Sequence, residues 1–159
     1  MDALWLIPLL PGLGAAINGL IGIRAFPKAV SGAVAVASMT GAFVLSVFAF
    51  VRLLALPPAS RDVTQVLADW IPPMPLATHE TIGILAAPWG FRLDPLAAMM
   101  LLVVTGIGTL LHVYSTAYMA REPRGGVARY FCYLNLFCCF MLLLVLGSNA
   151  LVMFVGWEG

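Results

Sequence analysis

Charged residues are scarce in this sequence. Asp, Glu, Lys and Arg make up only 9% of its 159 residues, whereas 62% are hydrophobic. Soluble domains carry about 25% charged and about 45–50% apolar residues. The formal net charge is +1 and the only lysine is Lys28, so the chain has no basic surface for nucleic acid. The sequence therefore predicts an integral membrane protein that is surrounded by the lipid bilayer.

Cysteine is also scarce, and its pattern does not favour a metal site. The three cysteines are Cys132, Cys138 and Cys139, without the paired C-x-x-C spacing of zinc sites. Two adjacent cysteines are poorly placed to form a disulfide with each other. The chain also lacks phosphate-binding and dinucleotide-binding glycine motifs, and it has no flavin or iron–sulfur signature. We expect the cysteines to be packing residues, and we expect no metal or cofactor on this chain.

Long apolar runs dominate what is present, because a helix needs about 20 apolar residues to cross a bilayer. Four runs meet this length, over residues 3–23, 30–51, 95–118 and 128–147. A fifth begins near Ser148, but the residues from Asn149 onward would rise only about 16 Å, half of a hydrocarbon core about 30 Å thick. We expect an all-α polytopic membrane protein with four transmembrane helices and the start of a fifth. We also expect these residues to be the N-terminal part of a longer chain. The alternative for the last segment is a short C-terminal stub at the membrane interface.

One long loop, residues 57–94, separates the second run from the third. It holds six prolines, which forbid a continuous helix because proline removes a backbone donor and clashes with the preceding turn. Two short β-prone stretches, THETIGIL (78–85) and WGFRLD (89–94), lie around AAPWG. They predict a short β-hairpin that caps the outer face.

The loop ends in a signal for the start of a helix. Asp94 is placed to cap the third helix, with Pro95 in the first turn. The chain then divides into two transmembrane helices in residues 1–56, an extracytoplasmic loop in residues 57–94, and helices three to five in residues 95–159.

The lysines and arginines of the short loops predict the orientation in the membrane. One side carries Arg24, Lys28, Arg121, Arg124 and Arg129, and the other side carries Arg52, Arg61 and Arg92. Because positive loops stay inside, the richer side is expected in the cytoplasm. The N-terminus is then extracytoplasmic.

Small residues recur at helical spacing in the first two runs. Ala15 and Gly19 are four residues apart, as are Ala33, Ala37 and Gly41. Such spacing lets helix backbones approach closely in lipid. We expect these faces to pack against other helices.

Glu158 is the first candidate functional residue. If the fifth helix starts near Asn149 at the outer surface, Glu158 lies about 13–14 Å deep at about 1.5 Å per residue, close to the midplane. An acid at that depth costs about 2.5–3.5 kcal/mol, and its proton affinity depends on desolvation and on nearby cations. A lysine that approaches and retreats would load and unload such an acid, as in a proton relay. The alternative is an acid near the interface, or a neutral one that is hydrogen-bonded.

His112 is the second candidate, near the cytoplasmic end of the third run. The ordinary pKa of histidine, about 6.5, suits proton transfer. Tyr114, Ser115 and Tyr118 would share a hydrogen-bond network with it. The alternative is a packing histidine whose hydrogen bonds are satisfied. Asn135, in the fourth run, is expected to hydrogen-bond between helices.

Two longer stretches resemble a known family. FRLDPLAAMMLLVVTGIGTLLHVYSTAYM (91–119) and RYFCYLNLFCCFMLLLVLGSNALVMFVGWEG (129–159) are similar to subunit L of respiratory NADH–quinone oxidoreductase, complex I. This is the outermost of the antiporter-like membrane subunits of that complex. The combination of HxYSxxYM, YFxYLNLF and GWEG in this order is specific. Residues 1–56 fit more loosely, and residues 57–90 depart from the compact outer loop of the family.

The resemblance implies a translocase subunit of the membrane arm, which contributes to proton translocation coupled to the oxidation of NADH by quinone. Redox chemistry would take place elsewhere in the complex. In the family, the glutamate of GWEG is a key acid of the proton path and pairs with a lysine on a later helix. Glu158 matches this acid, and the lysine would lie beyond Gly159. His112 matches a histidine of the third helix of the family.

The resemblance also implies the surroundings. The partners would be the other membrane-arm subunits of complex I, and the transported species would be protons. The location would be the bacterial inner (plasma) membrane, or the mitochondrial inner membrane. These residues alone, without the later lysine, are not expected to pump.

Two other functions remain open from the sequence. The large subunit of a multisubunit cation/proton antiporter, or of a membrane-bound hydrogenase, shares the helix plan and the acid, although the glycine after Glu158 favours complex I. A purely structural protein that packs on other helices would need only the small-residue faces.

Overall fold

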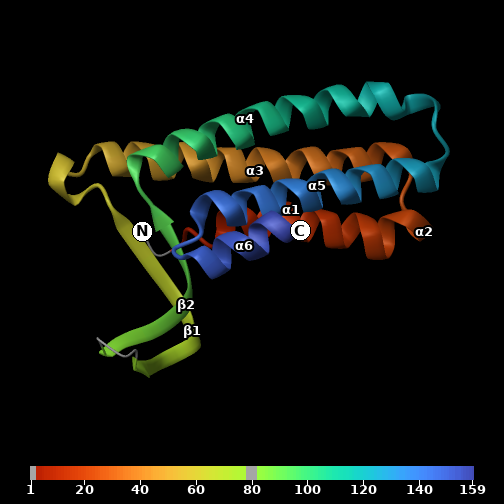
Figure 1. Cartoon of the computed structure of the whole chain (residues 1–159). Coiled ribbons are helices and arrows are strands. Elements are labelled where there is room, and N and C mark those ends of the chain that lie inside the picture. Colours follow the sequence, from red (N-terminus) through yellow and green to blue (C-terminus); the bar gives the residue numbers. More distant parts are fainter. Residues whose placement is uncertain (1–2, 78–81) are drawn as a thin grey trace.

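The computed structural model describes residues 3–77 and 82–159. Its helices lie side by side as a bundle, and a β-hairpin extends from one end of that bundle (Figure 1). Within the described residues, the helical elements are α1 (Leu6–Ala16), the π-helix η1 (Ile17–Gly22), α2 (Ile23–Ala25), α3 (Lys28–Leu54), η2 (Pro58–Ser60), α4 (Pro95–Tyr118), η3 (Met119–Arg121), α5 (Arg124–Leu146) and α6 (Ala150–Glu158). The strands are β1 (Val63–Ala77) and β2 (Ile82–Leu93).

Four helical segments of the described chain are long and apolar enough to cross a membrane. They are Leu6–Ala25, Lys28–Leu54, Pro95–Arg121 and Arg124–Leu146. The predicted runs fall on these segments with ends displaced by only a few residues, because the length of an apolar run is set by the thickness of the hydrocarbon core. The short helix α6 follows as the fifth. The predicted fold class is therefore confirmed, and the chain is an integral membrane protein.

Polar side chains begin the two helices whose starts the sequence marked. Asp94 Oδ1 accepts a hydrogen bond from the backbone N–H of Ala97 at 2.8 Å, and Pro95 is the first residue of α4. Asn149 Oδ1 accepts from two backbone N–H groups at the start of α6, both at 3.1 Å. The predicted Asp94 cap is confirmed, and the fifth helix starts at Asn149, where it was expected.

The outer loop contains a hairpin, but the predicted pairing was wrong. β1 pairs with β2 in an antiparallel two-stranded sheet, from Val63 opposite Leu93 to Ala77 opposite Ile82. The two stretches expected to pair with each other were 78–85 and 89–94. Residues 82–85 of the first and residues 89–93 of the second both belong to β2, and residues 78–81 lie outside the described residues. The partner is instead the proline-rich segment. Both strands of such a sheet are edges, where proline is tolerated. Three register shifts also interrupt the ladder, and Pro72 and Pro73 lie in the one between Ile71 and Met74.

The base of the hairpin is joined to the turn between α5 and α6. Phe91 forms an isolated antiparallel bridge with Gly147. The Ser148 N–H donates to Gly90 O at 3.1 Å. The side-chain amide of Asn149 donates to Pro88 O at 2.7 Å. The strand β2 and the start of α6 are thereby held together.

The apolar core near the hairpin is formed by residues from the helices and from β2 together. It consists of the buried residues Leu4, Ile7, Ala49, Leu53, Phe91, Leu93, Ala98, Leu101, Leu142 and Leu146. Because this core lies at the end of the bundle where the hairpin joins, it fixes the hairpin base on the ends of α3, α4 and α5 (Figure 1).

The two small-residue faces that were predicted to pack against other helices differ in how far they are buried in this chain. Ala15 is buried, and a Cβ added to Gly19 would lie 2.8 Å from Cys132 Sγ, so α1 and η1 do pack closely on α5. On α3, Ala33 and Ala37 are exposed within this chain. The buried face of α3 is a neighbouring one, formed by Ser31, Gly32, Ala35, Met39, Ala42, Ser46, Ala49 and Leu53.

Candidate functional site

His112 lies in the interior of the bundle, on the face of α4 that packs against α5. Its side chain is fully buried. Nδ1 lies 2.7 Å from Gly108 O, one turn earlier in α4, and Nε2 lies 2.8 Å from Asn135 Oδ1 on α5. The Phe131 ring stacks near the imidazole, with ring centroids 6.4 Å apart. A histidine that touches an amide across two helices is a group that can hold or exchange a proton.

Asn135 connects α4, α5 and α3, as expected of an interhelical hydrogen-bonding residue. Besides its contact with His112, its Oδ1 accepts from the Ser38 hydroxyl of α3 at 3.4 Å. Its Nδ2 is buried and has no hydrogen-bond partner among the described residues. A Cβ added to Gly14 of α1 would lie 2.7 Å from this nitrogen. The absence of a side chain at Gly14 therefore makes room for the amide.

A second buried polar pair lies between η1 and α3, and the sequence analysis did not find it. Asn18 Nδ2 donates to Ser31 O at 3.1 Å. Asn18 Oδ1 and Ser31 Oγ are buried and have no partner among the described residues. A buried polar group without a partner costs about 1–3 kcal/mol. The available signal was an isolated asparagine within the first apolar run.

The expected hydrogen-bond network around His112 is only partly correct. Ser115 is buried and exchanges a hydrogen bond of 2.9 Å with the Tyr130 hydroxyl of α5. Tyr114 and Tyr118 are exposed and stack on each other, with centroids 6.1 Å apart. They point away from the histidine because they follow it by two and six residues, about 200° and 600° around the helix.

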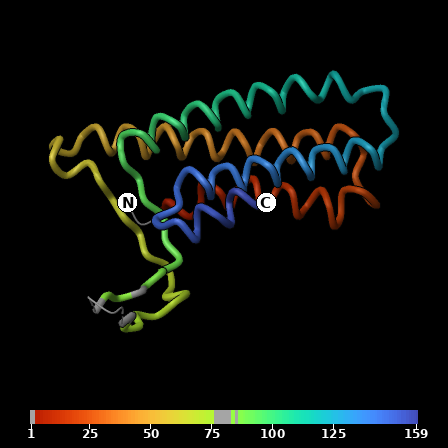
Figure 2. The backbone as a smooth tube through the Cα atoms, in the orientation of Figure 1, coloured from red at the N-terminus to blue at the C-terminus, as the bar shows by residue number. Residues whose placement is uncertain are grey.

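Glu158 is the last residue of α6, which runs back along α5 from the hairpin end (Figure 2). The C-terminal end of the chain lies about midway along the bundle (Figure 1). The carboxylate is exposed within this chain, and it forms no hydrogen bond or ion pair with the part of the chain that the structure describes. The acid therefore lies between the two ends of the bundle and leaves its carboxylate free for a partner from elsewhere.

The structure does not bring the two candidate residues together. A Cβ added to Gly156 of α6 would meet the backbone of Leu144 and the carbonyl oxygen of Phe140, so α6 packs on that face of α5. Leu144 follows Asn135 by nine residues, which at about 100° per residue is half a turn away. His112 and Glu158 therefore lie on opposite sides of α5.

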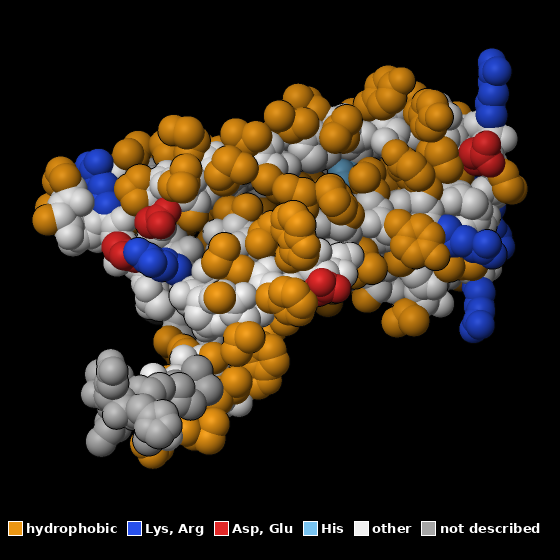
Figure 3. Space-filling view, viewed as in Figure 1, with side chains coloured by type: hydrophobic (Ala, Val, Ile, Leu, Met, Phe, Trp, Pro, Cys, Tyr) orange, Lys and Arg blue, Asp and Glu red, His pale blue; other side chains and the backbone are white. Residues whose placement is uncertain are grey.

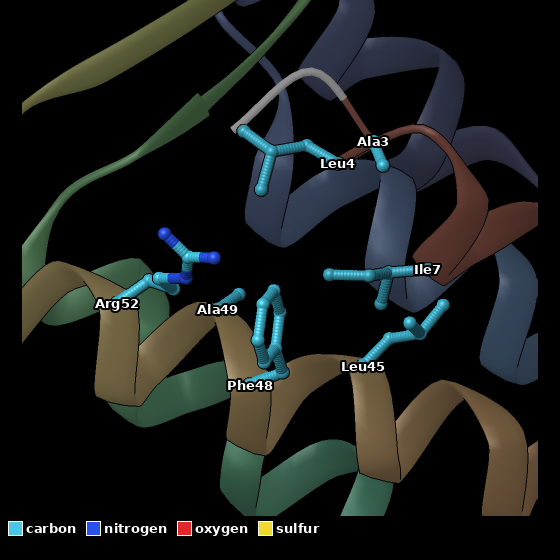
Figure 4. A pocket seen from close by; sticks show the side chains of 7 residues that line it. All are labelled: Ala3, Leu4, Ile7, Leu45, Phe48, Ala49 and Arg52. Carbon is cyan, nitrogen blue, oxygen red and sulfur yellow. The ribbon is translucent and has the colours of Figure 1, made fainter.

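Two apolar pockets lie near the bundle surface. One, of about 190 Å³, lies between α4 and α5 beside His112, and Leu111, Phe137 and Cys138 are among its lining residues. The other, of about 280 Å³, lies at the hairpin end. In Figure 4, Leu45, Phe48, Ala49 and Arg52 of α3 face Ala3, Leu4 and Ile7 across this second pocket. The Arg52 guanidinium lies 4.9 Å from the centre of the Phe48 ring, a cation–π contact.

Basic residues gather at the two ends of the bundle, and hydrophobic side chains cover the visible side between them (Figure 3). At the end away from the hairpin, Lys28 Nζ donates to Ala120 O at 3.0 Å and Arg124 Nη2 donates to Arg24 O at 2.8 Å. These carbonyls end helices, where cations are favourable. The two predicted loops of the richer positive side are thus joined to each other.

The hairpin end carries an ion pair outside the helices. Arg92 donates through Nε to Asp62 Oδ1 at 2.9 Å and through Nη2 to Asp62 Oδ2 at 2.7 Å. The hydrogen bond that Asp62 accepts from Arg92, and then the negative charge of Asp62, raise the pKa of Arg92 above its ordinary value. Among the described residues, no three His, Cys, Asp or Glu side chains gather as metal ligands would.

Comparison with known proteins identifies the family. Residues 80–131 match the family model described as NADH-Ubiquinone oxidoreductase (complex I), chain 5 N-terminus. His112 lies within this segment and Glu158 lies beyond it.

Individual relatives match almost the whole chain. It is 36% identical over 154 residues to NADH-ubiquinone oxidoreductase chain 5 of Arabidopsis thaliana, covering 97% of this chain and 21% of the relative. It is 35% identical over 155 residues to NADH-quinone oxidoreductase subunit L of Mycobacterium tuberculosis, covering 98% and 22%. For chain 5 of Phytophthora infestans the identity is 35% over 150 residues, covering 94% and 20%.

The chain spans about a fifth of the length of these curated relatives. The aligned regions include both the helices and the hairpin region, because the matches cover 94% or more of the chain. By these matches, the chain belongs to the family of complex I chain 5 and subunit L.

Proposed function

We propose that this chain is part of a membrane-arm subunit of complex I that moves protons across the membrane as NADH is oxidised by quinone. The observation that carries the proposal is the similarity to chain 5 and subunit L over almost the whole chain. The residues of the chain would hold and pass protons, while the electrons would move in other subunits. The other membrane-arm subunits are then its partners.

Glu158 is the residue that we propose as the principal proton carrier. Its helix starts at the hairpin end and is nine residues long, which at about 1.5 Å per residue brings the acid about 13–14 Å inward, near the bilayer midplane. An acid at that depth is costly and is normally functional. Its carboxylate has no cation beside it among the described residues. We propose that a cation outside this chain's described part controls its proton.

The proposed orientation places the hairpin on the side of the membrane that faces away from the cytoplasm or the mitochondrial matrix. The loops that Lys28 and Arg124 join would face the cytoplasm or matrix, because positive loops are retained on that side. The N-terminus and the hairpin would then face the opposite side. The proposed location is the bacterial inner membrane or the mitochondrial inner membrane.

The experiment that tests the proposal replaces Glu158 with glutamine in the full-length protein within the assembled complex. Glutamine keeps the size and hydrogen bonding of the side chain but binds no proton at neutral pH. We expect NADH-driven proton uptake by membrane vesicles to fall severalfold, measured with a pH-sensitive dye and divided by the rate of NADH oxidation. Assembly is checked by the amount of intact complex.

The matched control is Glu122→Gln, because Glu122 is an exposed acid in the loop before α5. This variant should pump as the unmodified complex does. If Glu158→Gln leaves the ratio of protons moved to NADH oxidised unchanged in fully assembled complex, Glu158 is not a proton carrier. A purely structural role for the chain would then be favoured.

A further inference from the structure

The two ring nitrogens of His112 each face an oxygen atom. Nδ1 lies 2.7 Å from Gly108 O, and Nε2 lies 2.8 Å from Asn135 Oδ1. A neutral imidazole has one N–H group and an imidazolium has two, while a carbonyl oxygen only accepts. Both contacts are therefore hydrogen bonds only when the ring carries two protons. A neutral ring that donates from Nδ1 needs a donor, not an oxygen, beside Nε2.

Asn135 carries such a donor on the other side of its amide. Its Nδ2 is buried and has no hydrogen-bond partner among the described residues. A half-turn about the Cβ–Cγ bond exchanges oxygen and nitrogen without changing the shape of the side chain. It would place Nδ2 where it donates to Nε2 of a neutral His112. Each orientation of the amide thus suits one protonation state of the ring.

The surroundings of the amide accept both orientations. Ser38 Oγ lies 3.4 Å from Asn135 Oδ1 and 2.9 Å from Ala35 O. A hydroxyl both donates and accepts. It donates to Oδ1 in one orientation; in the other it donates to Ala35 O and accepts from Nδ2. A Cβ at Gly14 would lie 2.7 Å from Nδ2, so the glycine provides the space in which the amide turns.

We propose that His112 and Asn135 form a proton-linked switch, in which the amide of Asn135 turns over each time His112 gains or loses a proton. The proton enters and leaves through the imidazole ring, and the amide rotates without exchanging a proton. Asn135 is then a positioning residue for His112. This inference rests on the proposed function, in which protons pass through the interior of the helix bundle.

The groups around His112 explain why an amide would have this role. From α5, the titratable neighbours are Cys138, in the same apolar pocket, and Tyr130, whose hydroxyl is paired with Ser115. From α3 the polar neighbour is Ser38. No charged side chain of the described residues bonds to the ring. A proton on His112 is therefore balanced by dipoles alone, and the two in contact with the ring are the Gly108 carbonyl and the Asn135 amide.

The first experiment measures the two groups directly in the assembled complex. The full-length protein is labelled with ¹⁵N in histidine and in asparagine side chains, and solid-state NMR spectra are recorded between about pH 5 and pH 9, the range in which histidine titrates. The signals are assigned by their loss in His112→Gln and Asn135→Leu. We expect the neutral ring to carry its proton on Nδ1, and the Asn135 amide signal to shift at the same pH as the ring.

Three results would each overturn the switch. One is a neutral His112 with its proton on Nε2, since the amide oxygen would then already be matched. Another is an Asn135 signal that does not move while His112 titrates, and the third is a ring that binds no proton in this range. If the amide stays still while Glu158→Gln still lowers proton pumping severalfold, the switch is wrong and the proposed function stands.

The second experiment uses the pH profile of proton pumping. Asn135→Leu removes both the oxygen that accepts from the protonated ring and the nitrogen that donates to the neutral ring. The bond to the protonated ring is charge-assisted and is therefore the stronger of these two. We expect the pH profile to move towards acid by about one unit, equal to a tenfold change in proton affinity. The matched control is Asn18→Leu, another fully buried asparagine, which bonds to Ser31 and not to His112. An unchanged profile in Asn135→Leu, or an equal shift in the control, contradicts the proposal.

Discussion

Gly156 determines how closely α6 approaches α5, and it therefore holds Glu158 against the bundle. A Cβ at this position would lie 2.7 Å from Leu144 Cα and 2.9 Å from Phe140 O. These are backbone atoms of a long helix, which cannot move aside as the tip of a flexible side chain can. Any side chain at Gly156 thus forces α6 to shift.

We expect Gly156→Ala to destabilise the full-length protein by about 1–3 kcal/mol, the usual cost of overpacking. The measurement is the thermal unfolding midpoint of the purified protein in detergent. Gly125→Ala is the matched control, because a Cβ there would meet only Ile23 O, at 3.9 Å. Equal midpoints for the two variants would show that α6 does not rest on α5 in this way.

At the residue scale, the sequence identified which polar groups lie in the interior but not what they touch. His112 and Asn135 stand out because polar groups are rare in apolar runs, and both are buried. Their contact depends on the rotation of α4 against α5, which no local pattern encodes. For the same reason Tyr114 was expected beside the histidine, although it faces outward. The role of Glu158 stays a prediction.

Among the elements, the outer hairpin shows where local patterns fail. Its presence follows from β-prone residues between prolines, but its pairing does not. The prolines of β1 disfavour a strand in a wide sheet, whereas a two-stranded ribbon with register shifts has unpaired positions that tolerate a missing N–H. The partner of a strand is a tertiary property, so local patterns cannot choose between a nearby stretch and the proline-rich one.

A single side chain, Asn149, begins α6 and also ties it to the hairpin. The oxygen caps the helix and the nitrogen donates to Pro88 O. Asn149→Ala should lose both, about 1 kcal/mol for the cap and about 1 kcal/mol for the hydrogen bond. Asn149→Asp keeps the capping oxygen but has no donor for Pro88, so we expect an intermediate unfolding midpoint in the full-length protein. Equal midpoints for Asn149→Asp and the unmodified protein would show that the link to the hairpin contributes nothing.

The packing face of α3 is another property of an element that spacing alone does not decide. Small residues surround this helix on several sides, so a spacing of four residues occurs on more than one face. Ala33 and Ala37 satisfy it and are exposed, while Ser31 and Ala35 satisfy it and are buried. The choice follows from the complementary shape of α4 and α5, which the chain reveals only when folded.

Across the whole molecule, the spans were predictable because bilayer thickness imposes a minimum length on apolar runs. The π-helical turn η1 was not, since it depends on how α1 meets α3 and α5. The arginine and lysine contacts at the far end of the bundle were not expected either. From the sequence, Lys28 and Arg124 predict only the orientation. In the structure, each also donates a hydrogen bond to a carbonyl oxygen at the end of a neighbouring helix.

The orientation of the molecule is tested by two single cysteine variants of the full-length protein. Ala59 lies near the hairpin, and Glu122 lies at the opposite end; both are exposed. We expect a membrane-impermeant thiol reagent to label Ala59→Cys on intact cells or mitoplasts, and Glu122→Cys only after the membrane is opened. The reverse pattern would place the N-terminus on the inner side.

The join between β2 and the turn before α6 has a consequence for the depth of the acid. A short helix anchored only by lipid would slide and tilt with the thickness of the membrane around it. Here the anchor is a backbone bridge at Phe91 and a hydrogen bond from Asn149, both made to the base of the hairpin. The depth of Glu158 is therefore set by its distance from the hairpin base. We expect that depth, relative to the rest of the bundle, to stay the same in a thinner or a thicker bilayer.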